Sequence, residues 1–184
     1  MITRTLLLLL FVLPLLFAQT VNAQRDHLTP QEVDLVKDAQ ALDKRIEVFI
    51  KAADRRLLVL NGGTAVVANT KQAKKEAALW GDLPTGSRAE LISDIAKILD
   101  EAITNIDDVS ARDERNPLIA KSLRRLAQAV NTIMEQIKPM STTAKGEAEI
   151  ATFEQLNENA QSILEAANKL PPPEVEKKTK TKSN

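Results

Sequence analysis

The chain of 184 residues contains no cysteine and no tyrosine, and it has one histidine, His27, and one tryptophan, Trp80. Without cysteine it can form neither disulfides nor thiolate metal sites, and it cannot carry the lipid of a bacterial lipoprotein. A di-iron helical bundle needs Glu-x-x-His on two helices, which a single histidine cannot supply. We therefore expect no metal site and no cofactor.

The motifs of common enzymes are also missing. The sequence contains no Gly-x-Ser-x-Gly, Ser-x-x-Lys, P-loop or Gly-x-Gly-x-x-Gly motif, and a catalytic triad could draw only on His27. The apolar stripes of the predicted helices carry no paired carboxylates, so nothing indicates a carboxyl group with a raised pKa in an apolar pocket. We expect a protein that is not an enzyme.

Aromatic residues and an excess of positive charge are lacking as well. Lys and Arg total 25, Asp and Glu total 25, and the aromatic residues after position 23 are Phe49, Trp80 and Phe153. Proteins that bind nucleic acid use a basic surface or aromatic rings that stack on bases. We therefore expect no nucleic-acid partner.

An apolar run near the N-terminus is typical of a secretory signal. Arg4 precedes the run 6–17, and a polar segment then leads to Ala23, a small residue that suits a signal peptidase. The run is shorter than the ~20 apolar residues that cross a bilayer core as a helix. We predict a cleavable signal peptide over residues 1–23, export to the periplasm or the extracellular space, and no permanent membrane span.

Helical periodicity dominates the rest of the chain. Thr29-Pro30 with Glu32 forms a capping box, and the apolar residues that follow recur every three or four positions. This pattern predicts one continuous helix over residues 30–60, ended by Asn61-Gly62-Gly63. Residues 70–80, rich in Lys, Ala and Glu, predict a short helix.

A second capping box, Ser87 with Glu90, starts a helix that should end near Arg112. Asn116-Pro117 starts the next helix, because proline is favoured at the first helical position. Lys138-Pro139 should stop that helix, because proline inside a helix removes a hydrogen bond.

The last long helix follows Ser141-Thr142-Thr143 and should end at Leu170, with Ile150 in its buried stripe. Three prolines then end the helical pattern. The tail over residues 171–184 is rich in lysine and nearly without apolar residues, so we predict that it is disordered.

These elements predict an all-α fold: an antiparallel up-down bundle of four long helices plus one short accessory helix, in one domain over residues 24–170. The alternative is an extended helical hairpin or coiled coil that dimerises. Val36, Ile50 and Ile98 lie beside the main stripes and widen them, which favours a bundle. The oligomeric state is not determined by this pattern.

Acidic residues crowd the end of the predicted helix 88–112 and the loop after it: Asp107, Asp108, Asp113 and Glu114. The helix macrodipole disfavours anions at this end. In a structural interpretation, the two aspartates of the helix pair with basic residues of the next helix: Lys121, Arg124 and Arg125. In a functional interpretation, the acidic residues contact a partner or Ca²⁺, although no calcium-loop motif is present.

Trp80 is the second candidate contact residue. A single tryptophan beside the loop 81–86 either anchors that loop to the bundle or projects as a binding hot spot. The first interpretation predicts a buried ring, and the second an exposed one.

By elimination, the sequence predicts an exported, non-enzymatic helical-bundle protein with an interaction or structural role in the cell envelope and an unidentified protein partner. The first alternative is a carrier that holds a small molecule or haem between its helices, with His27 and Met134 or Met140 as haem ligands. The second is a protein of the membrane surface, held by an uncleaved signal or by amphipathic helices.

Overall fold

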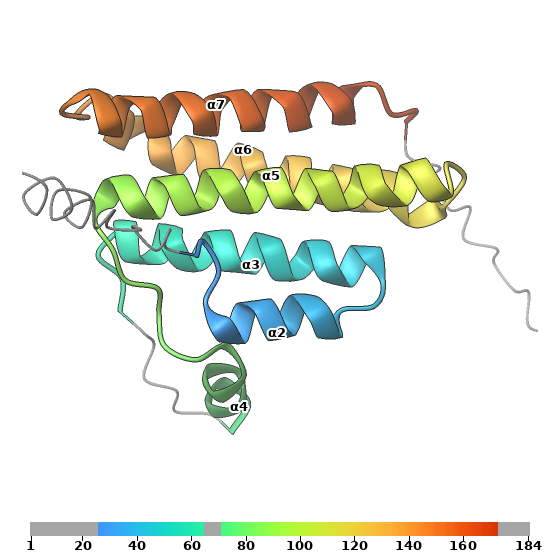
Figure 1. The fold of residues 1–184 in the computed structure, drawn as a ribbon, viewed down its shortest axis with the longest axis horizontal. Helices are drawn as coiled ribbons and strands as arrows, with labels where there is room; N and C mark the ends of the chain where they lie inside the picture. Colours follow the sequence, from blue (N-terminus) through green and yellow to red (C-terminus); the bar gives the residue numbers. More distant parts are fainter. Residues whose placement is uncertain (1–25, 65–70, 173–184) are drawn as a thin grey trace, which may run out of the picture.

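The computed structural model describes residues 26–64 and 71–172. The predicted signal peptide, and all but the first two residues of the predicted tail, lie outside the described residues. Within the described ranges, the chain forms six helices (Figure 1): α2 (Pro30–Asp38), α3 (Leu42–Leu60), α4 (Lys71–Trp80), α5 (Arg88–Arg112), α6 (Pro117–Ser141) and α7 (Glu147–Asn168). The prediction of an all-α fold with a short helix at 70–80 is confirmed for these residues.

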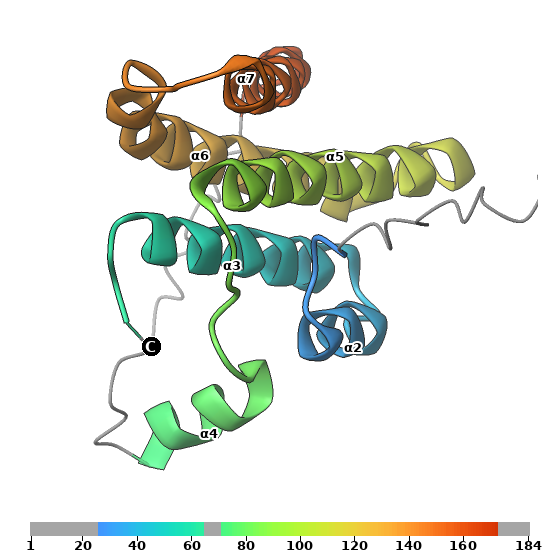
Figure 2. The same ribbon diagram turned by 60° about the vertical axis from the view of Figure 1, so that its left-hand side comes forward.

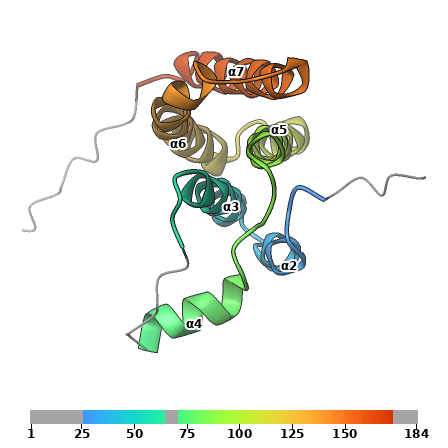
Figure 3. The same cartoon turned by 90° about the vertical axis from the view of Figure 1, so that its left-hand side faces the viewer.

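The four long helices form a bundle. Helix α3 packs against α5 and α6, and α7 packs against the same two helices from the other side. Figure 3 shows this arrangement close to end-on. In Figure 1 the chain runs from right to left along α3 and α6, and from left to right along α5 and α7.

The core of the bundle is built from the apolar stripes. One buried residue from each long helix illustrates it: Phe49, Ile95, Ile133 and Leu156. Because stripes of four helices of the same chain meet in one core, the structure agrees with the bundle and not with the extended hairpin.

The predicted continuous helix over residues 30–60 is wrong, because the chain leaves helical geometry at Ala39 and Ala41. No proline or glycine causes this break. Instead α2 folds back beside α3, and side chains satisfy the carbonyls that the break exposes: Gln40 donates to Lys37 O (2.9 Å) and Arg45 Nε donates to Ala39 O (3.1 Å). Tertiary packing therefore overrides the local preference for one long helix.

The predicted boundary between the last two helices is also wrong. Helix α6 continues through Pro139 to Ser141, and the hydroxyls of residues 141–143 donate to the carbonyls of residues 138–140 (2.9–3.0 Å). The Ser-Thr-Thr segment thus caps the end of α6 and does not start α7. Helix α7 begins after Gly146, whose φ of +81° is readily adopted by glycine.

Two parts of the molecule are more exposed to solvent than the core of the bundle: the first turn of α7 and helix α4. Ile150 is 45% exposed, contrary to the prediction that it is buried, because it lies in the first turn of α7 at the end of the bundle. Helix α4 stands apart from the bundle (Figure 2). Among the described helices, its main packing partner is α2.

Candidate functional site

Four charged side chains lie buried where α2, α3 and α5 meet, and we call them the charge cluster: Glu32, Arg55, Arg56 and Asp94. Glu32 is 0% exposed and Arg56 is 1% exposed. The sequence pattern does not predict this feature, because the apolar stripes of the predicted helices carry no carboxylates. Buried charges are rare unless they are paired, so the role of the cluster follows from the partners of each side chain.

Arg56 joins four segments of the chain. Its Nη1 donates to Glu32 Oε1 of α2 (2.7 Å) and to the carbonyl of Ala52 (2.9 Å), and its Nη2 donates to the carbonyl of His27 (2.6 Å). Its Nε lies 3.9 Å from Asp94 Oδ2 of α5. Arg56 therefore holds the N-terminal segment and α2 against α3 and α5.

Arg55 holds the end of α4. Its Nη1 donates to the carbonyl of Trp80, and its Nη2 donates to the carbonyls of Gly81 (3.2 Å) and Asp82. Its Nε lies 3.6 Å from Glu32 Oε1. Burial lowers the pKa of Arg55, and the nearby Glu32 carboxylate opposes that shift. The two neighbouring arginines thus share one carboxylate and fix different segments.

Glu32 serves both arginines and its own helix. Its Oε2 accepts from the backbone N–H of Thr29 (2.9 Å), which completes the capping box predicted from the sequence, while Oε1 faces the arginines. A signal for this pairing exists in the sequence: Arg56 follows Phe49 by seven residues, so it lies on the same face of the helix as a core residue. The partner of Arg56 on that face is decided by how α2 packs against α3.

Trp80 is buried at the junction between α4 and the loop that follows. Its ring lies under two cations, with Lys51 Nζ at 4.8 Å and Arg55 Cζ at 5.4 Å from the ring centroid. The adjacent Gly81 has a φ of +64° and lies against Gln31 of α2. This burial agrees with the interpretation that Trp80 anchors the loop, and it leaves little ring surface for a partner.

The acidic residues at the end of α5 and in the turn after it are all exposed: Asp107, Asp108, Asp113 and Glu114. In the described part of the chain, no ion pair connects the two helix aspartates to α6. Lys121 pairs with Asp43 of α3 (2.7 Å) instead, Arg124 donates to the carbonyl of Pro171, and Arg125 donates to Gln128 (3.3 Å). The predicted ion pairs between these two aspartates and the basic residues of α6 are therefore wrong.

The predicted contact residues do not form one surface. Trp80 precedes α5, whereas the acidic residues lie in its last turns and directly after it, and a helix of 25 residues spans roughly 37 Å. Figure 1 shows α4 below the bundle and the α5–α6 turn at its right-hand end.

His27 lies half-buried beside α5. Its Nε2 is 2.8 Å from Glu101 Oε2, and its Nδ1 is 3.5 Å from Asp26 Oδ1. Over the described residues, no group of three His, Asp or Glu side chains is arranged to hold a metal ion. The chemistry visible here is ion pairing and hydrogen bonding that positions segments.

No family model matches the chain, and neither a curated protein nor a solved structure matches it. Among the described helices, none is both long and apolar enough to span a membrane.

Proposed function

We propose that this protein is an exported, non-enzymatic helical-bundle protein that binds another macromolecule of the cell envelope through α4. The observation that carries the proposal is the attachment of α4: its body stands away from the bundle, while Arg55 bonds to three successive carbonyls at its end. The C-terminal end of α4 is therefore held at a defined place on the bundle.

The side chains of α4 support a binding role better than a packing role. Leu79 is 57% exposed, the largest value among the exposed large hydrophobic residues of the described chain. Ala77 and Ala78 beside it are exposed too, and among the α4 side chains that the structure describes, that of Trp80 joins the core. A helix that only stabilised the fold would turn its apolar side chains inward.

The charge of α4 indicates the chemistry of its partner. Lys71, Lys74 and Lys75 are exposed on this helix. A partner with an acidic surface and an apolar pocket for Leu79 would match both features. Because Arg55 already holds the end of α4, such a partner would have less of the helix to order, which reduces the entropic cost of binding.

Export is supported by the N-terminal sequence pattern of Arg4, an apolar run and Ala23. Mass spectrometry of protein recovered from the source cells tests this part of the proposal. A mature chain that begins at Gln24 supports it, and an intact Met1 in a cytosolic fraction contradicts it.

Photo-crosslinking tests the binding role. A benzophenone side chain is placed at Leu79, and a matched control carries the same group at Gln161, an exposed position of α7. We expect a discrete crosslinked species in the native envelope from position 79 and none from position 161. The species should disappear when Lys74 and Lys75 are changed to Glu. Equal crosslinking from both positions, or none from position 79, contradicts the proposal.

A further inference from the structure

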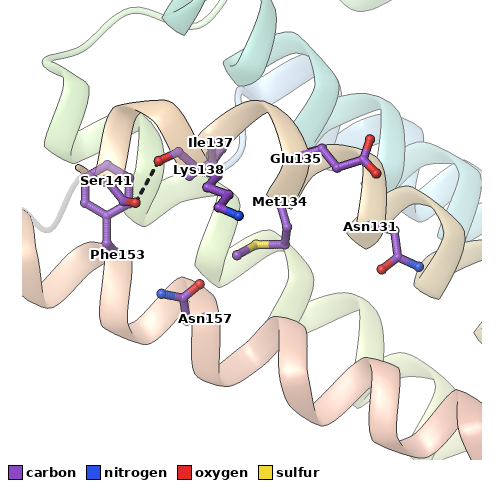
Figure 4. Close-up of a pocket in the computed structure, with 8 residues that line it drawn as sticks. All are labelled: Asn131, Met134, Glu135, Ile137, Lys138, Ser141, Phe153 and Asn157. Atoms are coloured by element: carbon purple, nitrogen blue, oxygen red, sulfur yellow. Dashed lines mark hydrogen bonds between the residues drawn. The ribbon is translucent and has the colours of Figure 1, made fainter. Parts of the chain in front are cut away.

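A hollow of about 440 Å³ lies between α6 and α7 (Figure 4). Helix α4 lies on the opposite side of the bundle from α7 (Figure 1). The volume of the hollow falls in the range of small-molecule sites, roughly 300–1,000 Å³. We call it the α6–α7 groove and describe it by an apolar floor and a polar rim.

The floor consists of Met134 and Ile137 from α6 and Phe153 from α7. Ile137 and Phe153 are buried, at 1% and 5% exposure, and Met134 is half-buried. Methionine is flexible and polarisable, so it can adapt its shape to a hydrocarbon chain. An unbranched apolar chain could therefore lie along the floor.

The rim provides donors without a partner. Within the described residues, the side chains of Lys138, Asn131 and Asn157 make no hydrogen bond or ion pair, whereas the hydroxyl of Ser141 is occupied by the carbonyl of Lys138 (2.9 Å). Figure 4 shows Lys138 and Asn157 directed toward the space between the helices.

The one carboxylate of the rim, Glu135, points away from that space in Figure 4. The charge that faces the groove is therefore the single positive charge of Lys138. One cation and a carboxamide donor match a single carboxylate better than a dianion or a cation.

We propose that the α6–α7 groove binds an amphiphilic monoanion, specifically a free medium-chain carboxylate. The carboxylate accepts hydrogen bonds from Lys138 Nζ and Asn157 Nδ2, and the hydrocarbon chain packs on Met134, Ile137 and Phe153. This site is independent of α4, so it stands or falls separately from the proposed macromolecular partner.

A second hollow of about 490 Å³ fits this chemistry less well. It is lined by Ile50 and Leu58, by two carboxylates, Glu47 and Asp54, and by three cations, Lys51, Arg55 and Arg125. Arg55 already donates to three backbone carbonyls and Lys51 lies over the Trp80 ring, while the two carboxylates would repel an anion. This second hollow therefore serves as an internal comparison in the experiment.

The test uses decanoate as the probe, with the protein lacking residues 1–23, and follows binding by calorimetry and by NMR. We expect saturable binding below about 1 mM, with shifts at the Met134 methyl and the Asn157 side-chain amide. Decanol should bind more weakly, and decyltrimethylammonium should not compete. Changing Lys138 to Gln should weaken decanoate binding about tenfold or more, since a hydrogen bond to a charged group is lost.

The matched control is Lys169→Gln, which removes an exposed lysine outside the groove and should leave binding unchanged. Both lysines are exposed, so both variants should fold, and thermal melting checks this. The proposal is overturned if decanol binds as tightly as decanoate, if both lysine variants behave alike, or if the shifts map to Ile50 and Leu58. Lys138-dependent binding to phosphatidylglycerol vesicles without binding of decanoate would overturn it as well, because the anion would then be a membrane lipid.

Discussion

Glu32 combines two roles in one carboxylate. One oxygen caps α2 at Thr29, and the other neutralises Arg56 in a site without access to solvent. The capping role is local and can be inferred from the Thr-x-x-Glu spacing. The pairing role requires that α2 fold back onto α3, and it decides how much Glu32 contributes to stability.

Glu32→Gln tests the pairing role. The amide oxygen of Gln can still accept from Thr29, but Arg56 loses its closest negative partner, at 2.7 Å. We expect the free energy of unfolding to fall by about 3–5 kcal/mol, because two buried arginines lose the carboxylate that they share. Chemical denaturation followed by circular dichroism measures this change.

Thr29→Ala is the matched control, since it removes the cap alone and should cost about 1 kcal/mol. If the two variants lose the same amount, the buried ion pair does not contribute in the way we infer. Replacing Glu32 and Arg56 together by Leu should recover only part of the loss, because the buried Arg55 still lacks the Glu32 carboxylate that lay 3.6 Å from its Nε.

Asp107 and Asp108 are exposed and make no ion pair among the described residues. Changing both to Asn should therefore leave the free energy of unfolding within about 0.5 kcal/mol of the parent, as for most surface substitutions. Asp43→Asn is the contrasting variant, because it removes a real 2.7 Å pair with Lys121 and should lower the melting temperature. A clear loss of stability in the Asp107→Asn, Asp108→Asn double variant would show that these aspartates have a structural partner.

At the scale of elements, the attachment of α4 is the feature on which the proposed binding role depends. Arg55→Met removes the hydrogen bonds to the carbonyls of Trp80, Gly81 and Asp82 while keeping an unbranched apolar stem. We expect the fluorescence of Trp80 to shift to the red and trypsin to cut faster after Lys74 and Lys75. Both changes follow if α4 is released from the bundle.

The comparison variant for this experiment is Lys51→Met. Lys51 also lies over the Trp80 ring, at 4.8 Å, but the hydrogen bonds to the backbone carbonyls come from Arg55. Its fluorescence and cleavage rate should stay close to those of the parent. Equal effects of both substitutions would assign the anchoring of α4 to cation–π contacts instead of the carbonyl bonds.

Helix boundaries differ in how well local sequence determines them. Both predicted capping boxes are present, at Thr29 and at Ser87, since each depends on residues three positions apart. The break at Ala39 and Ala41 has no such local signal. Helix α6 continues through Pro139, although proline is a local signal for a helix end. Near a helix end, proline forgoes a single hydrogen bond, and the hydroxyls of residues 141–143 cap the exposed carbonyls.

At the scale of the whole molecule, two surface ion pairs connect different helices and depend on pH. A hydrogen bond from Lys121 lowers the pKa of Asp43, and one from Arg88 lowers the pKa of Glu149. Arg88 of α5 also donates to Thr143 in the α6–α7 connection, at 3.1 and 3.2 Å. These contacts hold the ends of the bundle together.

Because the pKa values of Asp43 and Glu149 are lower in the folded state, protonation of these two carboxylates favours the unfolded chain. The stability that these pairs contribute is present above the ordinary pKa values, 3.8 for Asp and 4.5 for Glu, and is lost as the pH falls below them. Desolvation raises the pKa of Asp54, and the nearby Arg125 opposes that shift. Protonation of Asp54 at low pH therefore favours the folded state.

We expect the melting temperature to fall as the pH is lowered below 4.5, the ordinary pKa of Glu149. In an Asp43→Asn, Glu149→Gln double variant, stability at neutral pH should be lower and the decline on acidification shallower. Thermal melts over a series of pH values measure both slopes. Parallel slopes would mean that other carboxyl groups control the acid response.

The sequence by itself determined the local features: the all-helical class, the two capping boxes and the apolar stripes. Each depends on residues at most a few turns apart, so the 3.6-residue periodicity is enough to predict it. The candidate sites were predicted less well. The exposed acidic residues could be selected from the sequence, but it could not show that Lys121 pairs with Asp43 instead of with Asp107 or Asp108.

Only the tertiary structure decided which faces meet. It placed Glu32 and Asp94 on Arg56, turned Arg55 toward the end of α4, and left the α6–α7 groove with a cation over an apolar floor. Arg56 and Glu32 are 24 positions apart in the chain, and Arg55 and Trp80 are 25 apart, so no local pattern encodes these contacts. Their energies depend on burial, and burial depends on the packing of the complete bundle.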